Sequence, residues 1–345
     1  MHLSAYASER TKNAMAVCKS TIVIPNYNGI KYIAACLESL YSGTEKNIEI
    51  IVVDNASSDG SLELIKEKFP KVRLIENSEN TGFSRAVNQG ILASKTPYVI
   101  LLNNDTRAGL SFVHELEKAM DSDNRLFSAS ARMMSLYDKD IIDDAGDFYC
   151  ALGWAFARGK GKRIGSQNGK YNNDCNIFAS CAGAAIYRRE LLDSDKIGLF
   201  DENHFAYFED IDIGYRARLC GYENRYAAAA VVYHAGSATS GSRYNAFKTR
   251  LASRNSVYLA YKNMPLFQLL LNSPFLLAGF LIKTAFFIKK GLGREYITGL
   301  ADGVKLCMSE NGRKHKQRFA LKRFPQYIKI QLMLWKNMLL IVKIF

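Results

Sequence analysis

Four short runs of β-branched and apolar residues, separated by segments of helical period, constrain this fold more than any other sequence feature. The runs are TIVIP (21–25), IEIIVVD (48–54), VRLIE (72–76) and YVILLN (98–103). Near-continuous apolarity of this kind is typical of strands buried on both faces, and the segments between them place apolar residues every three or four positions. This β-α-β order predicts an α/β fold with a parallel sheet and right-handed crossovers. Ligands of such sheets bind beyond the carboxyl ends of the strands, so we expect functional residues directly after each run.

Charge is distributed unevenly along the 345 residues. The formal net charge is +13, but residues 1–262 carry 32 basic and 30 acidic side chains, whereas residues 263–345 carry 14 and 3. The basic excess therefore belongs to a C-terminal region, which does not fit a uniformly basic nucleic-acid-binding protein, and we expect no nucleic-acid partner. Apolar residues make up 48% of the chain, enough for a sizeable core.

The cysteines and the N-terminus indicate the compartment. Seven scattered cysteines without a C-x-x-C pair suit a reducing environment better than a disulfide framework or a structural zinc site. Residues 1–19 form a short segment before the first strand and contain no apolar run typical of a secretory signal. We therefore expect a cytoplasmic protein.

Polar motifs follow three of the runs: VIPNYNG (23–29), VVDNASSDGS (52–61) and LLNNDT (101–106). A carboxylate such as Asp54 at a strand end can accept hydrogen bonds from a ribose or a base, although Asp-Asn and Ser-Asp-Gly also form ordinary turns. No G-x-G-x-x-G follows the first run and no G-x-x-x-x-G-K-[ST] occurs, which disfavours a dinucleotide cofactor and an ATPase. The first motif also lacks the glycine-rich loop of a sugar-nucleotide-forming nucleotidyltransferase.

The remaining segments are less regular. Residues 151–176 are rich in Gly, Asn and basic residues, which predicts a long loop with a functional or mobile role. Order resumes at SCAGAAIYRREL (180–191), with a helix from about Glu209 and a strand that ends near His234.

The C-terminal region combines apolar and basic residues. Residues 266–290 carry one charge, Lys283, before the terminal lysines, and Pro274 is expected to split them into pieces too short to span a bilayer. Near the end, Lys329, Lys336 and Lys343 recur every seven residues, forming a narrow lysine stripe on an otherwise apolar helix. Residues 263–345 are thus expected to lie on an anionic membrane surface, with packing on the domain or a homo-oligomer seam as alternatives.

Five motifs, in their order and spacing, resemble a known family: VIPNYNG, IVVDNASSDGS, NTGFSRAVNQG (80–90), LLNNDT and FEDIDIGYR (208–216). They resemble the inverting family-2 nucleotide-sugar glycosyltransferases, most closely the bacterial rhamnosyltransferase-like branch of O-antigen and cell-surface polysaccharide synthesis. The resemblance covers about residues 20–262 and implies a GT-A fold, an α/β domain with a mostly parallel, Rossmann-like sheet.

The resemblance implies a nucleotide site in which Tyr27 stacks on the base and Asp54 reads its imide. Gly82 within this set could also be a simple helix-entry turn. The implied nucleotide-binding residues are Pro25, Tyr27, Asn28, Asp54, Asn55, Asp59, Asn80, Gly82, Arg85, Asn88, Asn103 and Asn104.

A divalent metal, Mg²⁺ or Mn²⁺, is implied on the donor diphosphate. LLNNDT takes the place of the family's D-x-D motif, but its first member is Asn103, so Asp105 supplies the only charge. His234 matches a histidine that ligates metal in some members, although a histidine at a strand end can simply pack.

By the same resemblance, Asp210 beside Glu209 is the general base for the acceptor hydroxyl, while Asp212 is assigned to complementing the helix dipole. Gly183 would pass close to the donor sugar and acceptor. Trp154 is either a sugar platform or a packing residue. Arg254 and Asn255 either contact phosphate or form a helix ion pair.

We therefore expect transfer of a sugar, with inversion, from a nucleotide diphosphate to a polyprenyl-diphosphate-linked saccharide. The first donor expected is dTDP-L-rhamnose, and a UDP-hexose such as UDP-galactose or UDP-glucose is the alternative. A catalytically silent scaffold is the non-enzymatic alternative. The expected location is peripheral, on the inner face of the cytoplasmic membrane.

Overall fold

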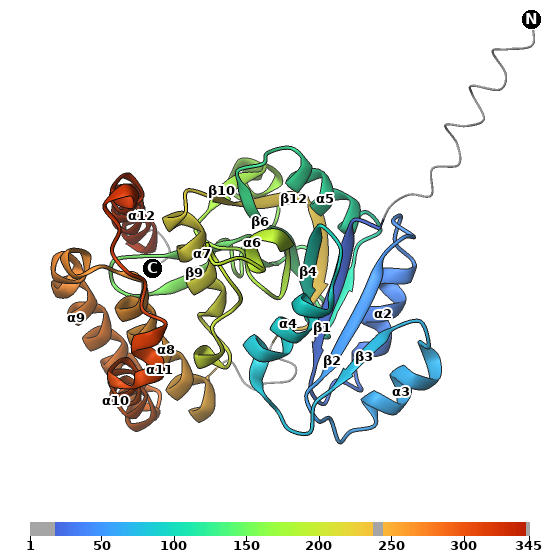
Figure 1. The fold of residues 1–345 in the computed structure, drawn as a ribbon, viewed down its shortest axis with the longest axis horizontal. Helices are drawn as coiled ribbons and strands as arrows, with labels where there is room; N and C mark the ends of the chain where they lie inside the picture. Colours follow the sequence, from blue (N-terminus) through green and yellow to red (C-terminus); the bar gives the residue numbers. More distant parts are fainter. Residues whose placement is uncertain (1–17, 237–243, 343–345) are drawn as a thin grey trace, which may run out of the picture.

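A computed structural model describes residues 18–236 and 244–342 of the chain (Figure 1). Most of the N-terminal segment, residues 237–243 after the strand that ends at His234, and Lys343 of the lysine stripe lie outside the described residues.

The first half of the sheet follows the predicted pattern. The parallel order is β3-β2-β1-β4, so the first strand lies in the middle with β2 and β4 on either side. Its elements are β1 (Ser20–Asn26), α2 (Ile33–Tyr41), β2 (Glu49–Asp54), α3 (Ser61–Lys68), β3 (Arg73–Glu76), α4 (Gly82–Ala93) and β4 (Tyr98–Leu102). Side chains of β1, β2 and β4 are almost wholly buried, as expected for strands covered on both faces.

The second half of the sheet is mixed. β11 pairs antiparallel with both β4 and β6, and β12 then runs parallel to β6. A small hairpin of β8 and β9 lies off this sheet. The elements are β5 (Thr106–Ala108), α5 (Phe112–Asp121), β6 (Leu126–Ser135), β7 (Ile142–Asp144), β8 (Asp147–Tyr149), β9 (Ala155–Ala157), β10 (Cys175–Ile177), β11 (Ala184–Arg188), α6 (Arg189–Leu192), α7 (Glu209–Leu219) and β12 (Glu223–His234).

The segment predicted as a long loop, residues 151–176, is largely irregular but not wholly so. It contains β9, a 3₁₀ segment at Gln167–Asn172 and the first residues of β10. Helix α7 begins at Glu209, as the sequence predicts.

In the described residues, five α-helices follow β12 and gather at one end of the molecule, opposite the side formed by β3 and α3 (Figure 1). They are α8 (Ala246–Asn263), α9 (Leu266–Lys289), α10 (Gly293–Met308), α11 (Glu310–Lys314) and α12 (Phe324–Val342). Helices α8 and α10 pack closely because Gly299 and Gly303 leave room: a Cβ at Gly303 would lie 2.6 Å from the carbonyl oxygen of Arg254.

The prediction that Pro274 splits the apolar segment is wrong, because α9 continues through it for 24 residues. A proline removes the N–H that would bond to the carbonyl four residues earlier, here Leu270. That carbonyl instead accepts the Ser273 hydroxyl at 2.8 Å, so the helix continues without an unpaired acceptor. In length and composition, α9 is the one helix of the described residues that could cross a membrane.

The C-terminal helices share a core with the sheet domain. Tyr149 and Tyr215 belong to the same buried cluster as Leu276, Tyr327 and Leu334. The residues near position 262 therefore do not separate two cores.

Buried amides fix how α9 and α12 meet. Asn272 and Gln331 exchange two hydrogen bonds of 2.8 Å, and Gln268 donates to the carbonyl of Tyr327 at 3.0 Å. The Tyr215 hydroxyl on α7 donates to Gln268 at 3.1 Å. Because unpaired amides are costly in a core, this network specifies one register between the helices.

Candidate functional site

The ends of β1, β2 and β4 are joined by one buried side chain that the motif analysis did not single out. Asn26 donates to Asp54 at 2.8 Å and to Ser61 at 2.9 Å, and its oxygen accepts the Asn104 amide at 2.8 Å. The structure thus brings Asp54 and Asn104, both predicted nucleotide ligands, to the same edge of the sheet. Gly29 packs directly over Asn26 and Asn104, where a Cβ would collide with both amides.

The predicted base-binding residues lie on the rim of this edge. Tyr27 is 38% exposed after the half-buried Pro25, and Asn28 adopts a positive φ of 50°. Asn28 accepts the backbone N–H of Ser58 at 2.9 Å. Asp59 accepts the backbone N–H of Ile30 at 2.8 Å. Hydrogen bonds therefore close the loops after β1 and β2 on each other and leave the Tyr27 ring at the surface.

Asn55 and the start of α4 form a second set of contacts. Asn55 accepts from Thr81 at 3.0 Å and donates to the carbonyl of Gly82 at 3.2 Å, while Asn80 accepts the Gly82 N–H at 3.0 Å. Gly82 has a φ of +83°, and a Cβ there would lie 2.6 Å from the Phe205 ring. The glycine is thus both a helix-entry turn and a point of close approach to the loop before α7.

Helix α4 also positions that loop. The buried Asn88 amide donates to the Phe200 carbonyl at 2.8 Å and accepts the Phe200 N–H at 3.0 Å. Arg85, one turn earlier, is exposed. Contact of Arg85, Asn88 or the other residues of this edge with a nucleotide stays a prediction.

Asp105 and His234 come together although 129 positions separate them. His234 Nε2 lies 3.1 Å from Asp105 Oδ1, and His234 Nδ1 lies 2.7 Å from Asp143 Oδ2. Lys160 from the long loop lies 2.6 Å from the other oxygen of Asp143. Burial opposes charge on the imidazole, but the hydrogen bonds to Asp105 and Asp143 outweigh it and raise the pKa of His234 to about 9.

The donor set here fits a divalent ion. Asp105 and His234 would offer it a carboxylate oxygen and an imidazole nitrogen, ligand types compatible with Mg²⁺ or Mn²⁺, whose facing atoms lie 3.1 Å apart. Asp143 on the far nitrogen matches the carboxylate–histidine–metal arrangement that fixes a ligand's tautomer and ring orientation. To bind an ion through Nε2, His234 would have to lose the proton from that nitrogen and so be neutral.

Asp210 and Glu209 lie in the first turn of α7. Burial raises the pKa of Asp210, although a 2.7 Å hydrogen bond from the backbone N–H of Ile211 and a bond to Asp147 oppose this. Burial and the Asp210 charge raise the pKa of Glu209, which is 7% exposed. A half-buried carboxylate with a raised pKa suits a general base better than an exposed one.

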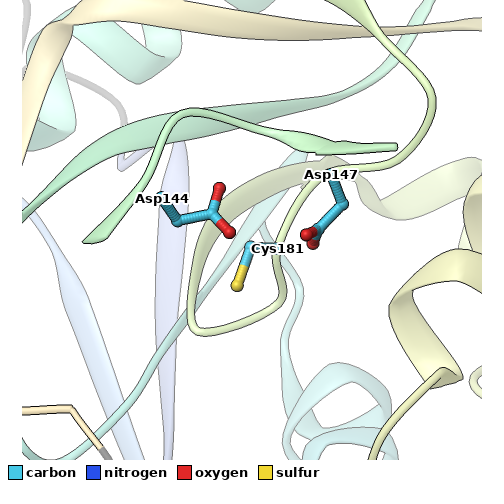
Figure 2. Close-up of side chains that lie close together, drawn as sticks. All are labelled: Asp144, Asp147 and Cys181. Carbon is cyan, nitrogen blue, oxygen red and sulfur yellow. The ribbon is translucent and has the colours of Figure 1, made fainter. Parts of the chain in front are cut away.

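Three further acidic or thiol side chains adjoin Asp210. Asp144, Asp147 and Cys181 each offer an atom within 4.8 Å of the others, and Figure 2 shows both carboxyl groups directed toward the cysteine. Burial raises the pKa of Asp144 to about 7 and raises the pKa of Asp147 well above its ordinary value, with the charges of Asp144 and Asp210 adding to the effect on Asp147. The hydrogen bond between Asp147 and Asp210 raises the pKa of Asp147 and lowers that of Asp210, the directions expected when Asp147 is the donor.

The backbone before α7 is held in an uncommon conformation. Phe205, Tyr207 and Phe208 all have positive φ, between 62° and 70°. Each such non-glycine residue costs of order 1–3 kcal/mol and persists only where surrounding contacts impose it. Asn255 imposes it here, because its fully buried amide donates to the carbonyls of residues 204, 206 and 207 at 2.8–2.9 Å.

Arg254 and Asn255 therefore hold this loop. Arg254 donates to Asn255 and to the carbonyls of Asn203 and His204. Within the described residues both side chains bond to amide and carbonyl oxygens, and neither forms the helix ion pair considered from the sequence.

The assignment of Asp212 to the helix dipole alone is wrong. Its fully buried carboxylate bonds to Arg216 at 3.0 Å, Lys262 at 2.8 Å and Asn263 at 2.8 Å. Lys262 also lies 2.7 Å from Asp201. Asp201, His204 and Asp212 could hold a cation by spacing, but the Lys262 ammonium already supplies the positive charge there.

The two predicted sugar-contacting residues differ in their surroundings. Gly183 lies against the end of β4, where a Cβ would approach Asn103 Nδ2 to 2.9 Å. Trp154 instead packs on α9: its Nε1 donates to the Gly279 carbonyl at 3.1 Å, and Lys283 Nζ lies 5.4 Å from its ring centre. These are the contacts of a packing residue, the alternative considered from the sequence.

Similarity to solved structures defines the class of protein to which this fold belongs. The fold matches that of a mannosyltransferase from Pyrobaculum calidifontis solved with GDP-Man and Mn²⁺, with a TM-score of 0.52, 16% identity and coverage of 95% of this chain and 93% of that one. It also matches GalNAc-T7 solved with UDP, GalNAc and Mn²⁺, with a TM-score of 0.56, 16% identity and coverage of 72% and 48%. The fold is that of a GT-A glycosyltransferase.

The family model for glycosyl transferase family 2 matches residues 21–195, just over half of the chain, and the chain belongs to this family. A relative from Mycobacterium tuberculosis, N-acetylglucosaminyl-diphospho-decaprenol L-rhamnosyltransferase, is 25% identical over 240 residues, which cover 62% of this chain and 75% of the relative. A teichoic acid poly(glycerol phosphate) polymerase from Staphylococcus epidermidis is 33% identical over 110 residues, covering 30% and 15%. The protein is a glycosyltransferase, and its fold and family are as predicted.

Proposed function

We propose that this enzyme transfers L-rhamnose from dTDP-L-rhamnose, with inversion, to a saccharide on a polyprenyl diphosphate carrier. The observation that carries the proposal is that Asn26 joins Asp54 to Asn104 at the strand ends, directly beside the Asp105–His234 pair. The rhamnosyltransferase relative supports the sugar and the acceptor class. UDP-galactose and UDP-glucose remain the competing donors.

The chain's own residues divide the work. Tyr27 and Asp54 bind the base, and Asp105 and His234 would hold a divalent cation, Mg²⁺ or Mn²⁺, which would supply positive charge at the leaving diphosphate. Asp210 takes the proton of the acceptor hydroxyl as its oxygen attacks the anomeric carbon from the side opposite the diphosphate. Asp147 donates a hydrogen bond to Asp210 and so keeps that carboxylate oriented.

The acceptor class agrees with the outer surface of the C-terminal helices. Of the 26 large apolar side chains exposed in the described residues, 18 lie between Leu266 and Leu339. Exposed apolar area of this extent marks a surface that another phase or partner covers. We propose that these helices lie on the anionic inner face of the cytoplasmic membrane, with Lys329 and Lys336 at the headgroups.

Helix α9 lies along this surface in our proposal and does not cross the bilayer. Its buried residues Gln268, Asn272, Leu276 and Gly279 form one stripe against the protein. Phe267 contacts Tyr327 near one end, and Phe287 stacks on Tyr296 near the other. A helix that packs on the protein through one stripe and is held near both ends is placed to enter the interface with its outer side.

The test is an assay of Asp210→Asn with a polyprenyl-diphosphate-linked N-acetylglucosamine acceptor. We expect turnover to fall by about 10²- to 10⁴-fold, the usual contribution of a general base. Stabilisation by dTDP with Mn²⁺ in a thermal melt should persist, since binding to the native state raises the melting temperature without catalysis. UDP giving the larger stabilisation, with transfer from a UDP-hexose, would assign the competing donor.

Asp193→Asn is the matched control. This exposed carboxylate follows α6, near the start of β4 and so at the opposite ends of the strands from the candidate site. Unchanged turnover in Asp210→Asn would remove Asp210 from the role of base. Failure of the wild-type enzyme to transfer any sugar, with no nucleotide stabilising it, would favour the silent scaffold.

A further inference from the structure

An apolar cavity of about 490 Å³ lies among the C-terminal helices, away from the edge where the strand-end motifs meet. Its walls come from three helices: Val257 and Tyr261 on α8, Leu276 and Phe280 on α9, and Val304 and Met308 on α10. The volume is within the range of about 300–1,000 Å³ typical of small-molecule sites. Neither the strand-end motifs nor the chemistry proposed for Asp210 uses it.

The cavity opens on the surface proposed to face the membrane. Val304 is 49% exposed and Met308 61% exposed, so both form wall and mouth. Leu277 and Leu281 on the neighbouring turns of α9 are each 61% exposed. An apolar chain in the membrane interface could therefore enter the cavity between these apolar side chains.

Charge at the cavity favours an anionic ligand. Arg313 is the one charged residue of the wall. Residues 305–323, which include it, carry seven basic side chains and one acidic one. A lipid with a long apolar chain and a phosphate group matches both an apolar wall and a basic border.

Helix α8 connects the cavity with the catalytic loop. Val257, Ala260 and Tyr261 line the cavity, while Asn255 holds the strained loop directly before Asp210. A chain bound in the cavity is thus bound to the same helix that fixes the proposed base.

We propose that this cavity binds the isoprenoid chain of the polyprenyl diphosphate acceptor, with Arg313 and its basic neighbours facing the phosphates. The inference rests on the proposed acceptor class and extends it by giving the carrier lipid its own site. It predicts that chain length, and not only the saccharide, determines how well an acceptor is used.

The test compares two substitutions one heptad apart on α10. Val304→Trp fills the mouth, whereas Ile297→Trp places the same indole side chain at a position of similar exposure, 51%, outside the cavity wall. Each is assayed with N-acetylglucosamine on a long polyprenyl diphosphate and on a geranyl diphosphate. We expect Val304→Trp to lower kcat/KM for the long-chain acceptor by about tenfold, since displacing even two methylene groups has that effect, and to leave the geranyl acceptor and Ile297→Trp unchanged.

An equal loss with both acceptors, or an equal effect of both substitutions, would overturn the proposal. If Val304→Trp melts early, Met308→Trp at the same mouth replaces it.

A binding measurement separates this inference from the proposed reaction. A fluorescent long-chain polyprenyl phosphate in detergent micelles should bind the wild type and Ile297→Trp, and about tenfold more weakly Val304→Trp, whether or not any sugar is transferred. Full retention in Val304→Trp would overturn the cavity assignment. Displacement by equimolar phosphatidylglycerol would show an acyl-chain site, which also overturns it. Absence of transfer with this binding pattern intact would refute the proposed reaction alone.

Discussion

The strand ends of the sheet and the C-terminal helices both bury hydrogen-bonded polar side chains, but they differ in what surrounds those side chains. At the edge, the amides and carboxylates that follow β1, β2 and β4 bond to one another, as Asn26 does to Asp54 and Asn104. In the helices, polar side chains such as Asn272 and Gln331 are buried between α9 and α12, and apolar side chains such as Leu332 and Leu339 face outward. The first region is arranged to bind a polar ligand in water, whereas the second is arranged for a surface that excludes water.

Lys262, near the end of α8, joins the C-terminal helices to the domain that carries the strand ends. Its side chain is 3% exposed, and its ammonium lies 2.7 Å from Asp201 and 2.8 Å from Asp212 on α7. This buried ionic contact is strongly destabilising to break because the carboxylates remain buried.

Lys262→Met should therefore have the largest effect on stability. We expect a loss of about 3–5 kcal/mol in the free energy of unfolding, and a melting temperature lower by roughly 10 °C. Urea and thermal denaturation measure both quantities. Lys305→Met, at an exposed lysine of α10, is the control. A loss below 1 kcal/mol in Lys262→Met would mean that the ionic contact does not hold the regions together.

The pH dependence of the same variant sharpens the result. Burial alone would raise the pKa of Asp201, but the Lys262 charge outweighs it and lowers that pKa to about 2. In the wild type this stabilisation is present above the ordinary aspartate pKa near 3.9 and is lost as pH falls toward 2. In Lys262→Met burial prevails, the pKa of Asp201 rises above its ordinary value, and stability should fall as pH rises from about 4 to 7. An unchanged pH profile would contradict the conclusion that the Lys262 charge lowers the pKa of Asp201.

How much the sequence could predict differs between the regions for a physical reason. Buried parallel strands carry a local pattern, and all four runs begin or end within about two residues of β1 to β4. Asp105 and His234 were implied by family resemblance and lie 3.1 Å apart. Asp143 was missed because its partner His234 is 91 positions away and nothing local marks the contact.

Three neighbouring aspartates around a glycine turn are a local sequence signal for the acidic residues beside α7. Asp143, Asp144 and Asp147 fall within five residues around Gly146, whose φ of +100° reflects a tight turn between β7 and β8. At Pro274 a local rule failed, because the rule counts the lost hydrogen bond and not the Ser273 hydroxyl that replaces it. Packing of α12 against the sheet domain likewise could not be read from its lysine spacing.

Membrane binding tests the proposed role of the apolar side chains exposed on the C-terminal helices. The double variant Leu332→Ser/Leu339→Ser removes two side chains that are 57% and 64% exposed on α12. We expect binding to vesicles of phosphatidylglycerol and phosphatidylcholine to weaken about 100-fold, at about 1.5 kcal/mol for each leucine withdrawn from lipid. Co-sedimentation measures this directly.

Leu92→Ser/Leu110→Ser is the matched control for that experiment. These leucines are 60% and 65% exposed, but they belong to the sheet domain. Equal weakening in both double variants would show that exposed leucine anywhere on the molecule drives binding. Full binding by Leu332→Ser/Leu339→Ser would place the contact elsewhere.

The smallest expected effect concerns Asp147, which lies next to two other buried carboxyl groups, Asp144 and Asp210. Asp147→Ala removes the hydrogen bond that lowers the pKa of Asp210, so the acid limb of the pH–rate profile should move to higher pH, with kcat about tenfold lower near neutrality. Asp147→Asn keeps an N–H donor and should leave both close to wild type.

The pair of Asp147 variants distinguishes a proton donor from a charge. A protonated carboxyl group and an amide can both donate to Asp210, whereas an ionised Asp147 could only repel it. If Asp147→Asn lost as much activity as Asp147→Ala, Asp147 would act through its negative charge, and Asp144 or Glu209 would have to carry the proton. Retained activity in Asp147→Asn would instead mean that the buried acidic residues beside α7 keep one base ionised by holding their own protons.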